Sequence, residues 1–376
     1  MQALVLVGGE GTRLRPLTLR HPKSALPLVD RPFIRYIVDW LALHGVSEVV
    51  LACGFGADPL REALGEDQGK GPRVRYVEED EPLGTAGPIR LAADQGLLGE
   101  RFLVLNGDLL SDLDLGALIR GHSERGAVAT LALSPVADPG AYGLVRREGG
   151  PQAPGGSPAS VNGEVLAFIE KPDSGEIDTD EVSAGAYVLE RSLIELIPPG
   201  QMVSIEHEVF PRLVGQGLYG HRLEGYWMDI GTPDRYLQAT WDILEDRVQT
   251  ALGARLGDDG LLIEDGVRVD PRARLSPPAM LDADVAVGAG AAVGARAVIG
   301  RGSEIGERAT VSGSVVFSDC RIAPGAIVDE AILAPGVEVG EGARVEAGAV
   351  VGEGARIEAG AQIGDGVRLG PGEVAS

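Results

Sequence analysis

The sequence predicts an α/β domain followed by a parallel β-helix, because the pattern of the chain changes near residue 263. Before that point, short apolar runs typical of strands alternate with segments whose apolar residues recur at helical spacing. After it, apolar residues recur at every sixth position, and glycine often follows them. These patterns divide the chain into an α/β domain over residues 1–241, a linker helix and connection over 242–262, and a β-helix over 263–376.

The first part is expected to form a mostly parallel, Rossmann-like sheet covered by helices, because strand-like and helical segments alternate along it. In such sheets, ligands bind beyond the carboxyl ends of the strands. Glycine, proline and serine crowd residues 149–160, which indicates a mobile loop inside a hairpin. The expected strands are 3–7, 48–53, 73–78 and 102–105; the expected helices are 33–44, a segment from Thr85, and 233 to about 248 with Thr232 as cap.

The last part is expected to be a left-handed β-helix of hexapeptide repeats. Each apolar residue would fill the interior, and the glycine after it would permit a tight corner. An Ala/Gly linker would have no reason to keep this period. The register slips by one residue after Val311 and again after Val328. The apolar positions are Ile263, Val269, Leu275, Leu281, Val287, Val293, Ile299, Ile305, Val311, Val316, Ile322, Val328, Leu333, Val339, Val345, Val351, Ile357, Ile363 and Leu369.

The composition excludes several classes of partner. A formal net charge of −23 over 376 residues argues against nucleic acid or an anionic membrane surface. The two cysteines, Cys53 and Cys320, lie far apart in sequence and indicate neither a disulfide framework nor a metal cluster. The N-terminus lacks the pattern of a signal peptide, and no apolar run approaches the length of a membrane span. We therefore expect a cytoplasmic protein.

A glycine-rich loop follows the first expected strand, with Gly8, Gly9 and Gly11 before Thr12 and Arg13. Missing side chains let backbone N–H groups approach phosphates. No Gly-Lys-Ser/Thr closes this loop as in a P-loop, and the third glycine of a dinucleotide fingerprint is absent. Glycine-rich turns are common, so the phosphate hypothesis depends on the cations that follow.

Lysine is rare in this chain: three lysines stand among 33 lysine and arginine residues. Lys23 and Lys171 each adjoin a proline, whereas Lys70 lies between glycines and is expected to be a solvated loop charge. A lysine offers a compact charge to one phosphate oxygen, where an arginine fork would be bulkier. Chance placement is the alternative, but this usage singles out Lys23 and Lys171 as phosphate ligands.

Two aspartates stand where a metal ion could bind. Asp108 ends an apolar strand in Asn106-Gly107-Asp108, and Asp229 follows Trp227-Met228. A carboxylate at a strand end is usually a cap or turn residue, so each is a weak signal alone. Together they could hold Mg²⁺, which typically takes one or two protein carboxylates and further ligands from substrate phosphates.

Taken together and in their order along the chain, several short motifs resemble those of the sugar nucleotidyltransferase family, also called nucleotide-sugar pyrophosphorylases. The resemblance covers essentially the whole chain and is closest to the mannose-1-phosphate guanylyltransferases. Family members usually have asparagine where Ser183 stands, and Thr232-Pro233 is nearer to the thymidylyl and uridylyl branches. The motifs are 8–14 with Pro22-Lys23, 82–88, 106–108, 170–172, 183–187, 204–206 and 227–231.

The resemblance implies a role for each candidate. The catalytic set would be Arg13 and Lys23 on the triphosphate, Asp108 and Asp229 on the metal ion, and Lys171 on the sugar phosphate together with Glu170. The turn 84–87 would lie against the nucleoside. The substrate-binding set would be Gly8, Gly9, Gly11, Thr12, Glu79, Gly84, Thr85, Gly107, Tyr142, Gly143, Glu170 and Ser183.

These residues suit an attack by a sugar 1-phosphate on the α-phosphorus of a nucleoside triphosphate. The nucleophile is already an anion, so no general base is required. The protein must offset repulsion between anions by positioning and electrostatics. The expected reaction joins GTP and mannose 1-phosphate to give GDP-mannose and pyrophosphate.

Glu79 is the residue proposed to recognise the base. Guanine presents N1–H and N2–H₂ side by side, and these two donors match an acceptor-only carboxylate. Uracil and thymine present one donor between two acceptors, which suits an amide better. A solvated acidic run at 78–81 is the competing interpretation of the same residues.

Three alternatives stay open at this stage. The first is a thymidylyl- or uridylyltransferase acting on glucose 1-phosphate, and the second is a non-catalytic regulatory subunit. The third is acyl transfer by the β-helix, which usually needs a histidine base. All five histidines precede residue 263, so the β-helix is expected to mediate homo-oligomerisation or regulation instead.

Overall fold

The computed structural model describes residues 1–54, 57–65, 71–151, 155–257 and 259–376. Lys70 and part of the loop 149–160 lie outside these ranges. The chain forms two compact units, one of Met1–Gly9 with Ile34–Trp227 and the other of Glu10–Phe33 with Met228–Ser376. The glycine-rich motif is therefore divided between the units, an arrangement that the expected boundaries at 241 and 262 did not include.

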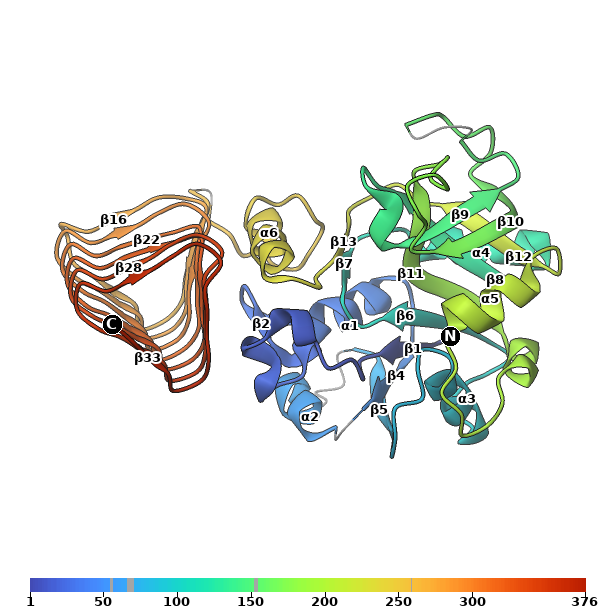
Figure 1. Ribbon diagram of the computed structural model, residues 1–376, viewed down its shortest axis with the longest axis horizontal. Helices are drawn as coiled ribbons and strands as arrows, with labels where there is room; N and C mark the ends of the chain where they lie inside the picture. Colours follow the sequence, from blue (N-terminus) through green and yellow to red (C-terminus); the bar gives the residue numbers. More distant parts are fainter. Residues whose placement is uncertain (55–56, 66–70, 152–154, 258) are drawn as a thin grey trace. The chain divides into compact units, whose positions relative to one another are not determined.

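The first unit is built on a nine-stranded sheet (Figure 1). Its strands lie in the order β5 (Arg73–Glu78), β4 (Glu48–Cys53), β1 (Gln2–Leu6), β6 (Arg101–Asn106), β11 (Glu181–Glu190), β8 (Ala129–Pro135), β12 (Leu218–Arg222), β10 (Asn162–Glu170) and β9 (Gly143–Arg147). The first four strands of this order run parallel, as the alternation predicts. β11 runs antiparallel to β6 and β8, so the rest of the sheet is mixed. The hairpin expected around 149–160 is formed by β9 and β10.

Each helix of this unit buries apolar side chains. Helix α1 buries Ile34, Ile37, Val38 and Leu41, the positions that the helical spacing predicts. Helix α3 begins two residues after Thr85, because residues 84 and 85 are held by other contacts. The helices are α1 (Phe33–Leu43), α2 (Asp58–Leu64), α3 (Gly87–Asp94), α4 (Leu115–Arg125) and α5 (Phe210–Leu213).

The second unit contains the expected β-helix, with three parallel sheets whose strands stack coil on coil (Figure 1). One sheet has β14 (Leu261–Ile263), β17 (Ala279–Leu281), β20 (Ala297–Ile299), β23 (Val315–Val316), β26 (Ile332–Leu333), β29 (Val350–Val351) and β32 (Arg368–Leu369). The second has β15 (Arg268–Val269), β18 (Ala286–Val287), β21 (Glu304–Ile305), β24 (Arg321–Ile322), β27 (Glu338–Val339), β30 (Arg356–Ile357) and β33 (Val374–Ala375). The third has β16 (Arg274–Leu275), β19 (Ala292–Val293), β22 (Thr310–Ser312), β25 (Ile327–Asp329), β28 (Arg344–Val345) and β31 (Gln362–Ile363).

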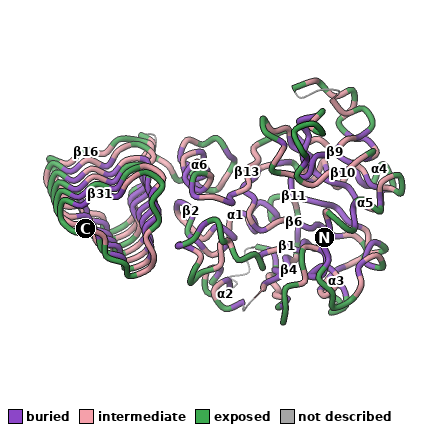
Figure 2. The backbone as a smooth tube through the Cα atoms, in the orientation of Figure 1, coloured by how far each residue is buried: buried purple, intermediate pink, exposed green. Residues whose placement is uncertain are grey.

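The two register slips in the sequence correspond to two shortened coils. The paired residues Leu281 and Ile299 are 18 positions apart. In the next two coils the spacing is 17, from Ile299 to Val316 and from Val316 to Leu333. The full length returns where Val351 pairs with Leu333. The periodic apolar residues from Leu281 to Ile363 are buried, and buried positions recur from coil to coil (Figure 2). Ile263 and Val269 were also expected to fill the interior, but they are exposed, because their strands lie at the edges of their sheets. The arrangement is consistent with the expected left-handed β-helix.

The role predicted for the glycines after the apolar residues was only partly right. Gly340 lies where a Cβ would come 2.5 Å from the amide nitrogen of Ala359 in the next coil, and a Cβ at Gly352 would lie 2.7 Å from Gly370. These glycines allow close approach between coils. The positive φ angles of the corners belong to other glycines two residues later, such as Gly342 at 66° and Gly354 at 66°.

Helix α6 (Pro233–Leu244) begins as predicted, with the Thr232 hydroxyl accepting from the amide of Arg235. It ends four residues before the expected Val248, because the chain turns at Asp246, where φ is 54°. Within the second unit, α6 contacts the β-helix: Trp241 Nε1 donates to the carbonyl of Gly313 at 3.0 Å. None of the helices in the described ranges is both long and apolar enough to cross a membrane.

The segment Glu10–Phe33 belongs to the same unit and is built from short turns. It contains the 3₁₀ turns η1 (Thr12–Leu14), η2 (Leu17–Leu19) and η3 (Lys23–Ala25) and the short strands β2 (Pro27–Leu28) and β3 (Arg31–Pro32). Tyr236 of α6 donates its hydroxyl to the carbonyl of Pro27, and Arg255 pairs with the buried Asp30. The segment is thus fastened to the second half of the chain.

Candidate active site

Two loops of the first unit meet at the carboxyl edge of its parallel strands. Gly8 and Gly9 follow β1, and Gly107 and Asp108 follow the neighbouring β6. The amide of Gly107 donates to the carbonyl of Leu6 at 2.9 Å. A Cβ on Gly107 would lie 2.5 Å from that oxygen, so only glycine fits. Asp108 is thereby placed one residue beyond a fixed contact.

Glu79 lies at the same edge, after β5, and is the buried member of its acidic run. Its side chain is 9% exposed, whereas Glu78, Asp80 and Glu81 are exposed. Its Oε2 accepts from the amide of Leu83 at 2.9 Å, and a Cβ on Gly8 would lie 3.2 Å from its Oε1. Burial raises the pKa of Glu79, and the Leu83 hydrogen bond opposes that rise. A solvated acidic run is therefore wrong for Glu79 itself.

The turn at Gly84 and Thr85 is fastened to a distant segment. Gly84 bridges Val203, and a Cβ there would lie 2.5 Å from the carbonyl oxygen of Val203. The Thr85 hydroxyl accepts from the amide of Ile205 and donates to Glu206 Oε2 at 2.6 Å. Ser204 donates to the same carboxylate oxygen at 2.9 Å. The Thr85 hydroxyl thus shapes the turn that was predicted to face the nucleoside.

Glu170 and Lys171 end β10 beside Tyr142 and Gly143. Glu170 pairs with Gly143 in the sheet, and a Cβ on Gly143 would lie 2.9 Å from Glu170 Oε2. The amide of Lys171 donates to the carbonyl of Tyr142 at 3.0 Å. The Tyr142 ring packs edge-to-face on Trp227, with centroids 5.2 Å apart, and Trp227 Nε1 donates to Ala184. These four candidates therefore form one cluster.

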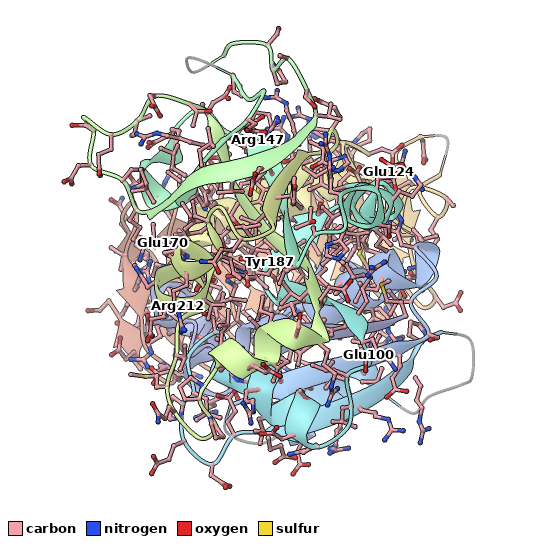
Figure 3. The ribbon with its side chains drawn as sticks, turned by 90° about the vertical axis from the view of Figure 1, so that its right-hand side faces the viewer. Glu100, Glu124, Arg147, Glu170, Tyr187 and Arg212 are labelled. Atoms are coloured by element: carbon pink, nitrogen blue, oxygen red, sulfur yellow. The ribbon has the colours of Figure 1, made fainter. Side chains whose placement is uncertain are left out.

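Acidic groups surround the buried phenol of Tyr187 in the same unit. Burial raises the pKa of Tyr187, and the charges of Glu206, Glu170 and Asp108 raise it further. Burial also raises the pKa of Glu170, as does Glu206, while Lys171 opposes the change. Figure 3 shows Tyr187 near the middle of the view and Glu170 to its left. Ser183 Oγ approaches the Tyr187 hydroxyl at 3.5 Å.

A second cluster, in the second unit, contains Arg13, Lys23 and Asp229. Lys23 Nζ lies 4.0 Å from Asp229 Oδ1, and Arg235 Nη1 donates to Asp229 Oδ2 at 3.0 Å. A Cβ on Gly231 would lie 2.6 Å from Arg13 Nη2 and 3.0 Å from Asp229 Oδ1. The structure thus brings Asp229 to two cations that stand more than 200 residues earlier in the sequence.

The start of the loop Gly11–Thr12 is shaped for this cluster. Gly11 has a φ of 61°, which favours glycine, and its carbonyl accepts from the Thr18 hydroxyl at 2.8 Å. A Cβ on Gly11 would lie 3.3 Å from the Cβ of Lys23. Glycine at this position lets the loop fold back so that Arg13 and Lys23 lie on one side.

Two residues in these clusters were not selected from the sequence alone. Glu206 lay inside a motif, but its partners Thr85 and Ser204 could not be known without the fold. Arg235 stands in the first turn of α6, and its position six residues after Asp229 gave no signal. Both act on candidates through side-chain contacts, which leave no periodic pattern in the sequence.

The donor groups present suit a divalent cation that relies on substrate for most of its ligands. Within the described ranges, no group of three His, Cys, Asp or Glu side chains could enclose a metal ion. Mg²⁺ commonly uses only one or two carboxylates and keeps water or phosphate oxygens as further ligands. Asp108 in the first unit and Asp229 in the second each carry one carboxylate.

Comparison with known proteins agrees with this description. Residues 2–246 match the family Nucleotidyl transferase, and residues 275–369 match the GMPPB C-terminal domain. A mannose-1-phosphate guanylyltransferase of Mycobacterium tuberculosis is 38% identical over 247 residues, 65% of each chain. A probable mannose-1-phosphate guanylyltransferase 2 of Oryza sativa is 39% identical over 241 residues, 63% of each chain. The matches thus span less than two thirds of these relatives.

A solved structure of apo UDP-glucose pyrophosphorylase has the same fold over 66% of this chain and 99% of its own, with a TM-score of 0.57 and 20% identity. That likeness speaks for the fold alone. Sugar nucleotidyltransferases generally use a divalent metal ion. Because the first family covers well over half of the sequence, the chain belongs to the nucleotidyl transferase family.

Proposed function

We propose that this chain transfers a guanylyl group from GTP to mannose 1-phosphate. The observation that carries the proposal is its similarity to mannose-1-phosphate guanylyltransferases over the part of the chain that holds the glycine loops, cations and carboxylates. In the reaction, a phosphate oxygen of the sugar phosphate bonds to the α-phosphorus of GTP. The bond from that phosphorus to the β-phosphate bridging oxygen breaks, and pyrophosphate leaves.

The second-unit cluster would act on the triphosphate. Arg13 and Lys23 would offset its negative charge, and the backbone N–H groups of Gly11 and Thr12 would add donors. Arg235 holds one oxygen of Asp229, so that the other oxygen keeps a fixed direction. This arrangement would let Arg13 and Lys23 stabilise the equatorial charge of the transition state by positioning and electrostatics.

The metal ion in this proposal is Mg²⁺, held by Asp108 and Asp229. When bound, it would neutralise phosphate charge and orient the phosphates for in-line displacement. Gly8, Gly9 and Gly107 would let the phosphates approach the carboxyl edge of the sheet.

The first-unit cluster would bind the sugar phosphate and the base. Lys171 would pair with the phosphate, and Glu170 with Tyr142, Gly143 and Ser183 would contact the sugar. Burial holds the pKa of Glu170 above its usual value. Glu79 would accept from guanine, with Gly84 and Thr85 shaping the nucleoside side.

The proposal includes a homo-oligomer formed through the β-helix, and a cytoplasmic location, where nucleoside triphosphates are supplied. Neither nucleic acid nor membrane is a partner in it, since the net charge of −23 opposes polyanions.

A matrix of substrates tests the proposal directly. The purified protein would be incubated with GTP, ATP, UTP or dTTP against mannose 1-phosphate, glucose 1-phosphate and galactose 1-phosphate, with Mg²⁺. Pyrophosphate release would be measured, and the nucleotide sugar identified by mass spectrometry. GDP-mannose as the preferred product is expected. Preferred use of dTTP or UTP with glucose 1-phosphate would overturn the proposal, and no turnover with any pair would favour a regulatory role.

A further inference from the structure

The last part of the β-helix reaches the backbone of the loop that carries Arg13. Arg368, the first residue of β32, donates from Nη1 to the carbonyl of Arg13 at 2.7 Å and to the carbonyl of Arg15 at 2.8 Å. All three residues belong to the second unit. One nitrogen thus joins two carbonyls of a loop more than 350 residues earlier in the chain.

The contacted loop has little backbone support of its own. In the turn η1, the amide of Leu14 donates to Gly11 at 2.9 Å and that of Arg15 to Thr12 at 3.2 Å. A 3₁₀ turn of this length has weak hydrogen-bond geometry. Its conformation therefore depends on contacts from outside the turn.

Packing behind the following residues is also incomplete. A cavity of about 470 Å³ lies between residues 16–32 and the β-helix, lined by Leu17, Leu26, Val298 and Phe317 among others. At its rim, Arg20 pairs with Glu353 at 2.8 Å. Because apolar contact does not fill this space, polar contacts at the rim have more influence on where the loop lies.

We propose that Arg368 is a positioning residue that holds the η1 turn so that Arg13 is aimed correctly. The proposal rests on the proposed function, in which Arg13 binds the triphosphate. Arg13 Nη2 lies against Gly231, with no room for a Cβ there. A small shift of the turn would move this guanidinium away, and misplacement of a binding group by about 1 Å can cost about 10²-fold in rate.

The test compares three variants of the full-length protein. Arg368→Met removes the donor but keeps an unbranched chain of similar reach, and Arg368→Lys restores one nitrogen with several donors. Arg356→Met is the matched control, because Arg356 is an exposed β-helix arginine whose partner, Glu338, also lies in the β-helix. Thermal unfolding would verify that all three variants fold.

Two readouts separate this inference from the proposed function. The first is amide hydrogen exchange of residues 10–20, measured without substrates. The second is the KM for GTP compared with kcat. Arg368→Met is expected to speed exchange at Leu14 and Arg15 and to raise the KM for GTP about tenfold, the order for lost hydrogen bonds near a charge, with a smaller change in kcat. Arg368→Lys should recover much of both values, and Arg356→Met should change neither.

Unchanged exchange in Arg368→Met would overturn the inference, as would faster exchange with an unchanged KM for GTP. A similar loss in Arg356→Met would also overturn it, because the effect would then belong to the β-helix in general. If the wild-type protein uses a different nucleotide, the same measurement with that nucleotide decides the role of Arg368. If it shows no turnover, the proposed function fails, and equilibrium binding of GTP replaces KM.

Discussion

The two units of the molecule hold their candidate residues by different means. In the first unit, Gly8, Glu79 and Gly107 follow strands, so that the register of the sheet fixes their backbone. In the second unit, Arg13 lies in the turn η1 and Asp229 ends the short strand β13 (Trp227–Asp229), and side-chain contacts hold both. Substitution of a glycine that packs against the sheet backbone in the first unit should therefore cost stability, whereas substitution of a glycine beside the side chains of the second-unit cluster should mainly change ligand binding.

The largest expected effect comes from deletion of residues 263–376. The segment Glu10–Phe33 belongs to the same unit as the β-helix, so the loop with Arg13 and Lys23 would lose its support. We expect transferase activity to fall by more than ~10²-fold, the order that misplaced catalytic groups cost, and light scattering to report a smaller oligomer.

Circular dichroism of the truncated chain would serve as the control for folding of the nine-stranded sheet. Full activity after the deletion would contradict the dependence of the loop on the β-helix. An oligomer of unchanged size would contradict the assembly role.

The next effect is expected from the two aspartates. Asp108→Asn and Asp229→Asn should each lower kcat by about 10²-fold, because each removes a proposed metal ligand where charge develops. Asp229→Asn should also raise the KM for the triphosphate, since Asp229 is paired with Arg235 and near Lys23.

Asp94→Asn is a suitable control for this pair, because Asp94 is exposed and only pairs with Arg90 on α3. Kinetics would be measured over a range of Mg²⁺ concentrations. Normal turnover in both aspartate variants would remove the metal assignment.

The sequence could predict features that follow from local patterns, but not contacts between side chains far apart in the chain. The period of six predicted the coils of the β-helix, including the two shortened coils, because each residue pairs with the equivalent position one coil away. The strands before the glycine loops were also predicted, since apolar runs mark them. The contacts of Arg368 with Arg13 and of Tyr236 with Pro27 join residues far apart, and no local pattern records them.

A pair of glycine substitutions sharpens the comparison. In Gly107→Ala, the new Cβ would meet the backbone oxygen of Leu6 at 2.5 Å, which cannot move easily. We expect a loss of roughly 1–3 kcal/mol in the free energy of unfolding. In Gly231→Ala, the Cβ would meet Nη2 of Arg13 at 2.6 Å, the mobile end of a side chain.

Gly231→Ala should therefore leave the denaturation midpoint almost unchanged and raise the KM for the triphosphate about tenfold, the order of one contact to a charged group. Chemical denaturation and steady-state kinetics on both variants would be compared. Equal losses of stability would show that the two units do not differ in this respect.

Lysine replacements should have a smaller and unequal effect. Lys23 has a side chain that is 12% exposed beside Asp229, so a bulkier guanidinium would be crowded in Lys23→Arg. Lys171 is exposed, and Lys171→Arg should be impaired less. We expect turnover to fall by about tenfold in Lys23→Arg and about threefold in Lys171→Arg, because a site that fits a compact ammonium group accommodates a planar guanidinium poorly. Full activity in both variants would remove the argument from lysine usage.

The last expected effect concerns the choice of base by Glu79. Its carboxylate is buried, with Oε2 engaged by the Leu83 amide and Oε1 near Gly8. In Glu79→Gln, the side chain keeps its size, but an NH₂ donor group replaces one of the two acceptor oxygens, so one of guanine's paired donors would be mismatched. The ratio of kcat/KM for GTP to that for UTP should fall by about tenfold, since an unpaired buried polar group penalises the base that the site was built for. Glu81→Gln, at an exposed position of the same run, is the matched control.

The pH dependence gives a second check. Because burial raises the pKa of Glu79, the preference for GTP should weaken as the pH falls through that raised pKa, and this dependence should be absent in Glu79→Gln. If the wild-type preference is the same at all pH values and survives Glu79→Gln, the base is read by another residue.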